Sequence, residues 1–211
     1  AADDADVQDT LAALEGRVMR MAPDPDMKPQ EVANAILAFA TLGLMPGAEI
    51  RAALEAAVVR VAPDPDVKPQ AVSNVIWAFA TLGWEPGAEM RAALEAAVVR
   101  MGPDMKPQET ANVAWSYATL GLMPGAEARA ALEAAVVRMG LDMKPQETAN
   151  VAWSYATLGL MPGAEARAAL EAAVVRMGLD MKPQETANVA WSYATLGLMP
   201  GAEARAALEA A

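Results

Sequence analysis

The amino-acid sequence predicts an all-α protein, a right-handed α-solenoid in which helical hairpins stack one upon the next. Three observations support this fold. The tripeptide Lys-Pro-Gln recurs at spacings of 40, 38, 38 and 38 residues, at Lys28, Lys68, Lys106, Lys144 and Lys182. Each period also contains the start and stop signals of two helices. Finally, the stretch ANVAWSYATLGLMPGAEARAALEAA occurs three times letter for letter, beginning at Ala111, Ala149 and Ala187.

The first helix of each unit is expected to begin at a proline and to stop at a glycine. In the third unit, Pro107 suits the first helical position, where a missing N–H leaves no bond unmade, and Gly121 suits a left-handed cap. A Leu-Met-Pro-Gly turn follows. The second helix, AEARAALEAAVVRM, is expected to end at Gly140. Strands are not expected, because no stretch sustains a period-two alternation of apolar and polar residues.

The repeat boundaries follow from this alignment. The N-terminal sequence VQDTLAALEGRVMRM matches a second helix, with Leu14 at the position of Leu54, so the chain opens on a half-repeat. The longer first interval is explained by the loop APDPD, which later copies shorten to GPD or GLD. Within one continuous solenoid domain we expect a half-repeat cap at 1–26 and repeats at 27–66, 67–104, 105–142, 143–180 and 181–211, the last one truncated.

Composition excludes most site chemistry. The chain has no cysteine and no histidine, which removes disulfides, thiolate metal sites and the commonest general base. No carboxylate pair, glycine-rich phosphate loop or metal-ligand cluster is evident, so we expect no enzyme activity, catalytic residue, bound metal, cofactor or small-molecule substrate. No apolar run approaches the roughly 20 residues of a membrane span, so no membrane partner is expected. The chain begins Ala-Ala and lacks a transit peptide pattern, which suggests a processed or excised segment.

The first helix is predicted to be covered on several sides. At 100° per residue its apolar positions span roughly 220°, wider than the stripe of an ordinary surface helix. The remaining polar strip of the third unit holds Gln108, Glu109, Asn112, Ser116 and Thr119. When the repeats stack in register, these strips would form a polar ribbon along the array, and this ribbon is the candidate functional surface.

Three residue types on this ribbon are candidate readers of bases. An asparagine stands at one position in every unit, at Asn34, Asn74, Asn112, Asn150 and Asn188. Its amide offers both a donor and an acceptor, which suits a base edge, although a loop cap or a bridge between repeats would explain its recurrence equally well. The hydroxyl candidates, for which a neutral surface role is the alternative, are Ser116, Ser154, Ser192, Thr119, Thr157 and Thr195.

The lysines are candidate phosphate contacts. Each precedes a first helix, where unpaired N–H groups and the helix dipole already favour anions, and the five are Lys28, Lys68, Lys106, Lys144 and Lys182. Solvated loop lysines are the alternative. The arginines are less available to a ligand, because a carboxylate four residues away can form an ion pair with them on the same helix. The pairs are Arg129 with Glu133 and Arg138 with Asp142.

A tryptophan occupies one position in four units, where it is expected mainly to pack in the core. Leucine at the equivalent position of the first unit supports packing, while base stacking on the indole edge is the alternative. The positions are Leu37, Trp77, Trp115, Trp153 and Trp191.

The run KPQETANVAWSYATLG, together with KPQEVANAILAFATLG and KPQAVSNVIWAFATLG, resembles the octotricopeptide repeat family. The resemblance rests on a 38-residue period and a P-Q-x-x-A-N-x-x-W-x-x-A-x-L-G first helix, and it covers the chain from Met27 to its end. It implies an α-solenoid that binds single-stranded RNA at about one nucleotide per repeat through its inner helix. It also implies a chloroplast or mitochondrial role in RNA stabilisation, processing or translation. Verbatim copies further indicate recent duplication or consensus engineering.

Two functional hypotheses therefore stay open. In the first, the array binds single-stranded RNA, with lysines on phosphates and the asparagines, serines and threonines on bases. In the second, it is a protein-interaction, structural or designed scaffold without a nucleic-acid role. Its acidic N-terminal half-repeat and neutral-polar ribbon suit a basic or extended protein partner. A weaker third possibility makes the array one segment of a larger ribonucleoprotein.

Overall fold

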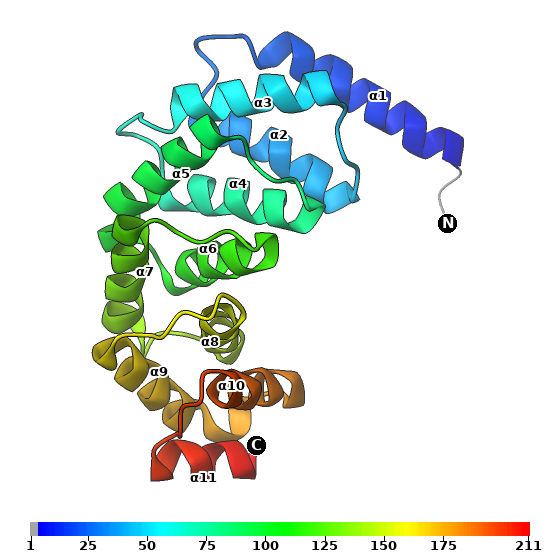
Figure 1. Ribbon diagram of the computed structural model, residues 1–211. Helices are drawn as coiled ribbons and strands as arrows, with labels where there is room; N and C mark the ends of the chain where they lie inside the picture. Colours follow the sequence, from blue (N-terminus) through cyan, green and yellow to red (C-terminus); the bar gives the residue numbers. More distant parts are fainter. Residues whose placement is uncertain (1–3) are drawn as a thin grey trace. The chain divides into compact units, whose positions relative to one another are not determined.

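The computed structural model describes residues 4–211, so the first three residues of the predicted half-repeat lie outside it. The described chain is helical throughout and contains no strand, as the sequence predicts (Figure 1). Its helices alternate between the two predicted types. The second-helix type comprises α1 (Asp4–Met21), α3 (Ala48–Val61), α5 (Ala88–Met101), α7 (Ala126–Met139), α9 (Ala164–Met177) and α11 (Ala202–Ala210). The first-helix type comprises α2 (Pro29–Leu42), α4 (Pro69–Leu82), α6 (Pro107–Leu120), α8 (Pro145–Thr157) and α10 (Pro183–Thr195).

The first helices begin and end where the sequence places them. Each starts at proline after a lysine N-cap in extended conformation. In all except α4, the third helical residue is a glutamate whose carboxylate accepts a hydrogen bond from the lysine backbone N–H, at 2.7–2.9 Å. The predicted left-handed cap is confirmed at Gly121, where φ is 64°.

The second helices are joined to one another by a recurring glutamate contact. In α3, Glu55 accepts hydrogen bonds from Gly87 N–H, the N-cap of α5, at 3.2 Å, and from Trp84 Nε1 at 2.9 Å. One repeat earlier, Glu15 accepts from Gly47 N–H at 2.6 Å. Because an N-cap glycine has no side chain to satisfy its helix end, the preceding repeat supplies the acceptor.

Replacing Glu55 by alanine is expected to lower the free energy of unfolding by about 2 kcal/mol, since hydrogen bonds to charged groups are worth about 1.5–3 kcal/mol each and Trp84 is buried. Urea unfolding followed by circular dichroism measures this change. The matched control is Glu49→Ala in the first turn of the same helix, which should cost only about 0.5 kcal/mol through the helix dipole. Equal losses in both variants would refute the inter-repeat role of Glu55.

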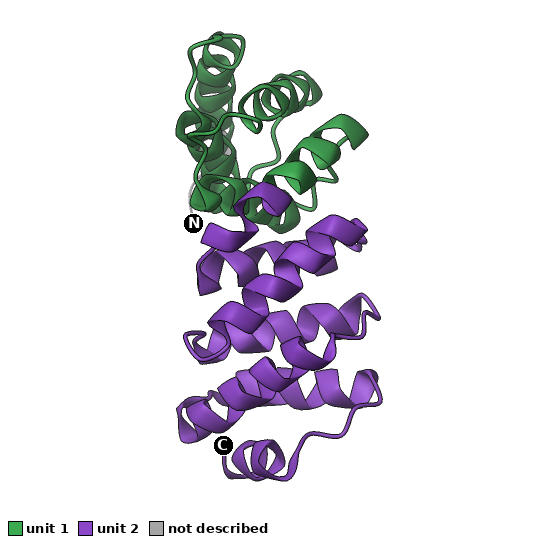
Figure 2. Ribbon diagram, turned by 90° about the vertical axis from the view of Figure 1, so that its left-hand side faces the viewer, with its two compact units in different colours: residues 1–97 green, residues 98–211 purple. Residues whose placement is uncertain are grey.

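The chain divides into two compact units, residues 1–97 and 98–211 (Figure 2). In the first unit α2 packs against α4, and α1 packs against α3. In the second unit α6, α8 and α10 pack in succession, and α7, α9 and α11 form a parallel succession beside them. Each unit is thus a stack of helical hairpins, and the predicted helical solenoid is confirmed.

The core repeats with the sequence. In the first unit Ile36, Phe39 and Phe79 are fully buried, and the Phe79 ring lies 4.0 Å from the Trp84 ring between centroids. In the second unit two successive clusters have nearly the same composition, one around Val151 and Tyr155 and the next around Val189 and Tyr193, with an alanine of the second in place of a leucine of the first. No helix in residues 4–211 is long and apolar enough to span a bilayer.

Candidate binding surface

All five candidate lysines are exposed, each at the N-cap of a first helix. In the described part of the chain no lysine ammonium takes part in an ion pair or donates a hydrogen bond. These groups therefore present one unpaired positive charge per repeat. Lys28 and Lys68 belong to the first unit, and Lys106, Lys144 and Lys182 to the second.

The helix ends beside these lysines are less attractive to anions than the sequence suggests. At Lys28, Lys106, Lys144 and Lys182 the N-cap N–H is already bonded to the glutamate three residues later. The carboxylate also offsets the partial positive charge of the helix N-terminus. An approaching phosphate would consequently meet the ammonium groups rather than an open N-cap.

The asparagine side chains are accessible. Asn34 is exposed, and its Oδ1 accepts a hydrogen bond from Gln30 Nε2 at 2.9 Å within α2. The other four, Asn74, Asn112, Asn150 and Asn188, are half-buried. Within residues 4–211 their amides neither cap a loop nor bridge to a neighbouring repeat. The donor and acceptor of these four amides therefore carry no protein hydrogen bond, whereas the Asn34 oxygen already has one.

The serines do not lie on an exposed face, so this expectation was wrong. Ser116, Ser154 and Ser192 are 0%, 3% and 2% exposed. Each hydroxyl donates to the backbone carbonyl of the asparagine four residues earlier, at 2.6 Å. A hydroxyl can satisfy itself in this way on its own helix, and the neighbouring repeat then covers it. These serines can position the asparagine backbone but cannot contact a base.

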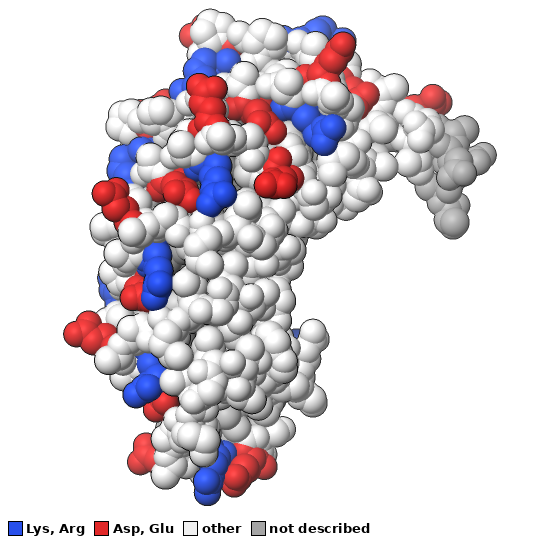
Figure 3. Space-filling model, in the orientation of Figure 1, with Lys and Arg blue, Asp and Glu red and all other residues white. Residues whose placement is uncertain are grey.

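The threonines lie where the first helices end. Thr119, Thr157 and Thr195 are all exposed, as predicted. Each is followed by the Leu-Met-Pro-Gly turn, whose methionines are exposed as well, at Met123, Met161 and Met199. In the second unit, the charged side chains visible in Figure 3 gather mainly over α7, α9 and α11, and most of the surface over the first helices in that view is uncharged. These three methionines are visible in the sequence, but their exposure was not expected, because methionine in a loop usually fills gaps in packing.

The tryptophans lie at the border between core and surface. Trp77, Trp115 and Trp153 are half-buried, and Trp191 in the last repeat is 47% exposed. Each of these tryptophans is therefore partly packed and partly accessible.

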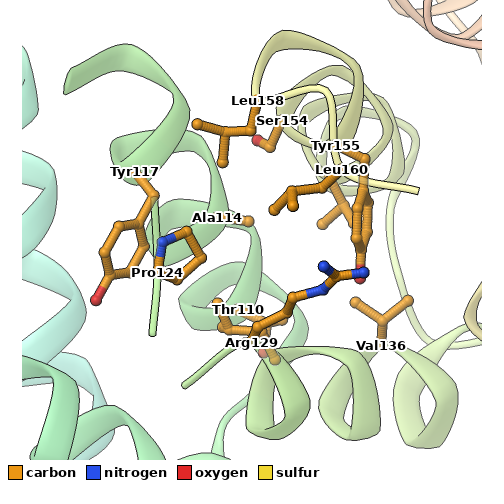
Figure 4. Close-up of a pocket in the computed structure, with 12 residues that line it drawn as sticks. Thr110, Ala114, Tyr117, Pro124, Arg129, Val136, Ser154, Tyr155, Leu158 and Leu160 are labelled. Carbon is orange, nitrogen blue, oxygen red and sulfur yellow. The ribbon is translucent and has the colours of Figure 1, made fainter. Parts of the chain in front are cut away.

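The second unit has small apolar cavities between repeats that cannot hold a ligand. The cavity between α6 and α8 is about 30 Å³ and is lined by Ala114, Tyr117, Ser154 and Tyr155 (Figure 4). Its copy between α8 and α10 is about 20 Å³. Such volumes fit a water molecule at most. A buried threonine hydroxyl without a protein partner lines each one, from Thr110 and Thr148.

Two tyrosines beside these cavities have perturbed acidity. Burial raises the pKa of the Tyr155 phenol well above its ordinary value, and the nearby Glu133 carboxylate raises it further. Burial also raises the pKa of Tyr193, with Glu171 adding to the effect. Both phenols therefore stay protonated well above neutral pH.

This acidity predicts alkaline destabilisation. Below about pH 10 both tyrosines are neutral in the folded and the unfolded chain, so their full contribution to the free energy of unfolding is present. Above that pH the unfolded chain loses the phenol protons while the folded chain keeps them, so the folded state loses stability. Once the unfolded tyrosines are ionised, from about pH 11, we expect the free energy of unfolding to fall by about 1.4 kcal/mol per pH unit for each tyrosine. Urea unfolding between pH 9 and about 12 measures the slope. The double variant Y155F/Y193F should lose that part of the slope, and an unchanged slope would contradict the assignment.

The arginines join repeats, a role that sequence spacing did not reveal. Arg60 Nη2 donates to the carbonyls of Ala22 and Asp24 at 3.0 and 2.9 Å. Its copy Arg138 donates to the carbonyls of Gly102 and Met105 at 3.0 and 2.8 Å. Arg176 likewise bonds the carbonyl of Met143. These bonds span more than thirty residues, so a reading of local pairs could not find them.

The two predicted arginine pairs have different outcomes. Arg129 and Glu133 form the expected ion pair at 3.4 Å between Nε and Oε1. Arg138 forms none with Asp142 among the described residues, because α7 ends at Met139 and the guanidinium turns back to the preceding repeat. Arg60, Arg129, Arg138 and Arg176 thus use their charge inside the fold, whereas the five lysine ammonium groups stay exposed.

Comparison with known proteins adds little to this geometry. No protein-family model and no curated protein matches the chain. Among solved structures, the designed armadillo repeat protein YIII(Dq)4CqI is similar at 14% identity over 100% of this chain and 95% of that chain, with a TM-score of 0.31. No group of three acidic residues in residues 4–211 is placed to hold a metal ion. The described chain is a helical-repeat protein.

Proposed function

We propose that this scaffold binds single-stranded RNA along the polar face of its first helices. The observation that carries the proposal is the recurrence of one exposed, unpaired lysine at the start of every first helix. Phosphates follow one another along a single strand, so cations repeated at a fixed structural period can contact successive stretches of backbone. The ammonium groups, rather than the helix N-termini, would supply the attraction.

Base contacts would come from the accessible asparagines and threonines. An asparagine amide in each repeat has a donor and an acceptor with which to meet a base edge. The half-exposed tryptophan three residues later, as Trp115 follows Asn112, offers an edge for stacking. The resemblance to octotricopeptide repeats supports the same reading, at about one nucleotide per repeat. From the same resemblance we propose that the protein acts in stabilising, processing or translating chloroplast or mitochondrial transcripts. It would do so either alone or within a larger ribonucleoprotein.

A second candidate function is a scaffold for an extended protein partner. Two observations favour it: the net charge of −11, which suits a basic segment, and the exposed methionines of the Leu-Met-Pro-Gly turns in the second unit. Such a partner would contact the part of the first-helix surface away from the charged helix starts, and its binding would not depend on the lysines.

Fluorescence anisotropy with the four RNA homopolymers, each at 50 and 200 mM salt, tests the RNA proposal. Because the last three repeats carry identical first helices, they should prefer the same base, so one homopolymer should bind more tightly than the others. Affinity should fall between the two salt concentrations. An absence of binding to every homopolymer at 50 mM salt would overturn the proposal. Binding of an unstructured basic peptide under the same conditions would favour the protein scaffold instead.

A further inference from the structure

The recurring Lys-Pro-Gln motif contains a glutamine that is exposed in every repeat. It is the second residue of each first helix and directly follows the proline that begins the helix. The lysine carries the candidate phosphate contact and the proline starts the helix, but packing does not explain the glutamine, because no copy is buried. The five copies are Gln30, Gln70, Gln108, Gln146 and Gln184.

In α2 this glutamine is bonded to the asparagine one turn later. Gln30 Nε2 donates a hydrogen bond to Asn34 Oδ1 at 2.9 Å. The oxygen and the nitrogen of an amide lie on opposite sides of its carbon, so Nδ2 of Asn34 is directed away from Gln30. The glutamine thus selects one of the two orientations that an asparagine amide can adopt.

The other four repeats have the same two residues without the bond. Glutamine and asparagine are four residues apart in every first helix, a spacing at which side chains are neighbours on the helix surface. Within residues 4–211 no hydrogen bond joins the two side chains in α4, α6, α8 or α10. Each of these glutamines is exposed and each asparagine is half-buried. Rotation of the side chains therefore suffices to bring the pair into the arrangement seen in α2.

The side chains around this pair limit which base it can read. In the third unit the exposed strip carries two amides, Gln108 and Asn112, and ends at Thr119. No arginine occurs in a first helix, and the Glu109 carboxylate is already bonded to the Lys106 N–H. Guanine is read mainly by arginine or lysine, cytosine by a carboxylate, and adenine by an asparagine or glutamine amide. With the lysines assigned to phosphates, the strip matches adenine.

We propose that the glutamine of each Lys-Pro-Gln motif is a positioning residue that orients the asparagine amide to read adenine. The proposal rests on the RNA binding proposed above. Glutamine Nε2 donates to asparagine Oδ1, as Gln30 does to Asn34. The second lone pair of Oδ1 then accepts from the adenine amino group, and Nδ2 donates to the neighbouring ring nitrogen.

An amide held in one orientation discriminates adenine from uracil. Adenine presents an amino donor beside a ring acceptor, whereas uracil presents the opposite order, an acceptor at O4 beside a donor at N3. The lysines hold the backbone on one side of the bases, so the order of donor and acceptor along the strip decides which base fits. An asparagine free to turn over would accept both bases.

Fluorescence anisotropy with labelled poly(A) and poly(U) at 50 mM salt tests this role through the ratio of the two affinities. The parent chain should bind poly(A) at least about tenfold more tightly than poly(U). Glutamate in place of glutamine has the same size but cannot donate to Oδ1, and it accepts from Nδ2 instead, which turns the amide over. The ratio should then fall by about tenfold or more. The substitutions, made together, are Gln108→Glu, Gln146→Glu and Gln184→Glu.

Two further triple variants separate orientation from charge. Lysine at the same three positions again offers a donor to Oδ1, so it should keep the ratio while it strengthens binding to both polymers. Glutamate at three exposed alanines of the second helices adds the same charge away from the pair. It should keep the ratio even if it weakens binding to both polymers. These alanines are Ala130, Ala168 and Ala206.

The outcomes distinguish this role from RNA binding itself. Binding to neither polymer by the parent chain would overturn both proposals. RNA binding without a preference for poly(A) over poly(U) would overturn the positioning role alone. The same conclusion would follow from a ratio that survives the glutamine-to-glutamate changes, or from lysine variants that lose it as the glutamate variants do. Circular dichroism of each variant confirms that the helices are retained.

Discussion

Replacing Phe79 by alanine is expected to lower the free energy of unfolding by about 3–5 kcal/mol, the largest loss predicted for a single side chain here. Phe79 is 1% exposed, lies against the Trp84 ring and belongs to α4, which packs on α2. Truncation removes the buried ring and leaves a cavity that the surrounding helices cannot fill. In a repeat array each unit is stabilised mainly by its neighbours, so the loss should be concentrated in residues 1–97.

Urea unfolding followed by circular dichroism measures this loss, and hydrogen exchange locates it. Phe79→Leu serves as the matched control, because it keeps most of the volume and should cost less than about 1.5 kcal/mol. Exchange that accelerates equally in residues 98–211 would contradict the local character of the effect. An alanine variant no weaker than the leucine variant would show that the ring does not fill the core as the structure indicates.

Replacing Lys106, Lys144 and Lys182 together by glutamine is expected to weaken binding to single-stranded RNA by about 100-fold at 0.1 M salt. Each phosphate contact in a single strand contributes about 0.7 to the slope of log K against log salt, so three contacts are worth about two log units over the decade below 1 M. The side chains are exposed and unpaired, so the substitutions should leave the fold unchanged. Fluorescence anisotropy with the preferred homopolymer measures the change.

The triple replacement by arginine provides the control for charge. It conserves three cations and should retain most of the affinity, because arginine also binds phosphate. Urea unfolding of both variants should match the parent chain. RNA affinity that survives the glutamine substitutions would remove the lysines from the binding surface.

The helix boundaries could be predicted from the sequence because they depend on local chemistry. Proline at the first helical position and glycine after the last one define α6 as Pro107–Leu120, and the second helix of the same unit follows as Ala126–Met139. The identity of the copies then transfers both assignments along the chain. Lysine exposure was predictable as well, since an unpaired lysine is almost never fully buried.

The candidate surface was only partly predictable, because side-chain partners depend on packing between repeats. Ser116 lies between the apolar arc and the polar strip, and a helical projection cannot tell which side the next repeat covers. Its hydroxyl bonds its own helix and is buried. The four-residue spacing of Arg138 and Asp142 predicted an ion pair. The guanidinium instead donates to backbone carbonyls 33 and 36 residues away, in the preceding loop. The packing of one repeat on the next, rather than the separation of residues along the sequence, determines these contacts.

The glutamates beside the lysines illustrate a similar limit. Sequence alone shows a lysine at each helix start and a glutamate three residues further on, as at Lys106 and Glu109. In the structure that carboxylate takes the N-cap N–H, so the helix end is satisfied before any ligand arrives. The attraction for RNA is therefore assigned to the ammonium groups, and its magnitude should follow the number of lysines.

The salt dependence of RNA binding by the intact chain tests this central claim most directly. If all five lysines contact phosphates, the slope of log K against log salt should be about −3.5, and it should fall to about −1.4 in the triple glutamine variant. Anisotropy titrations of the preferred homopolymer between 50 and 400 mM salt give both slopes. A slope near zero in the parent chain, or equal slopes in the two proteins, would contradict RNA binding through one lysine per repeat.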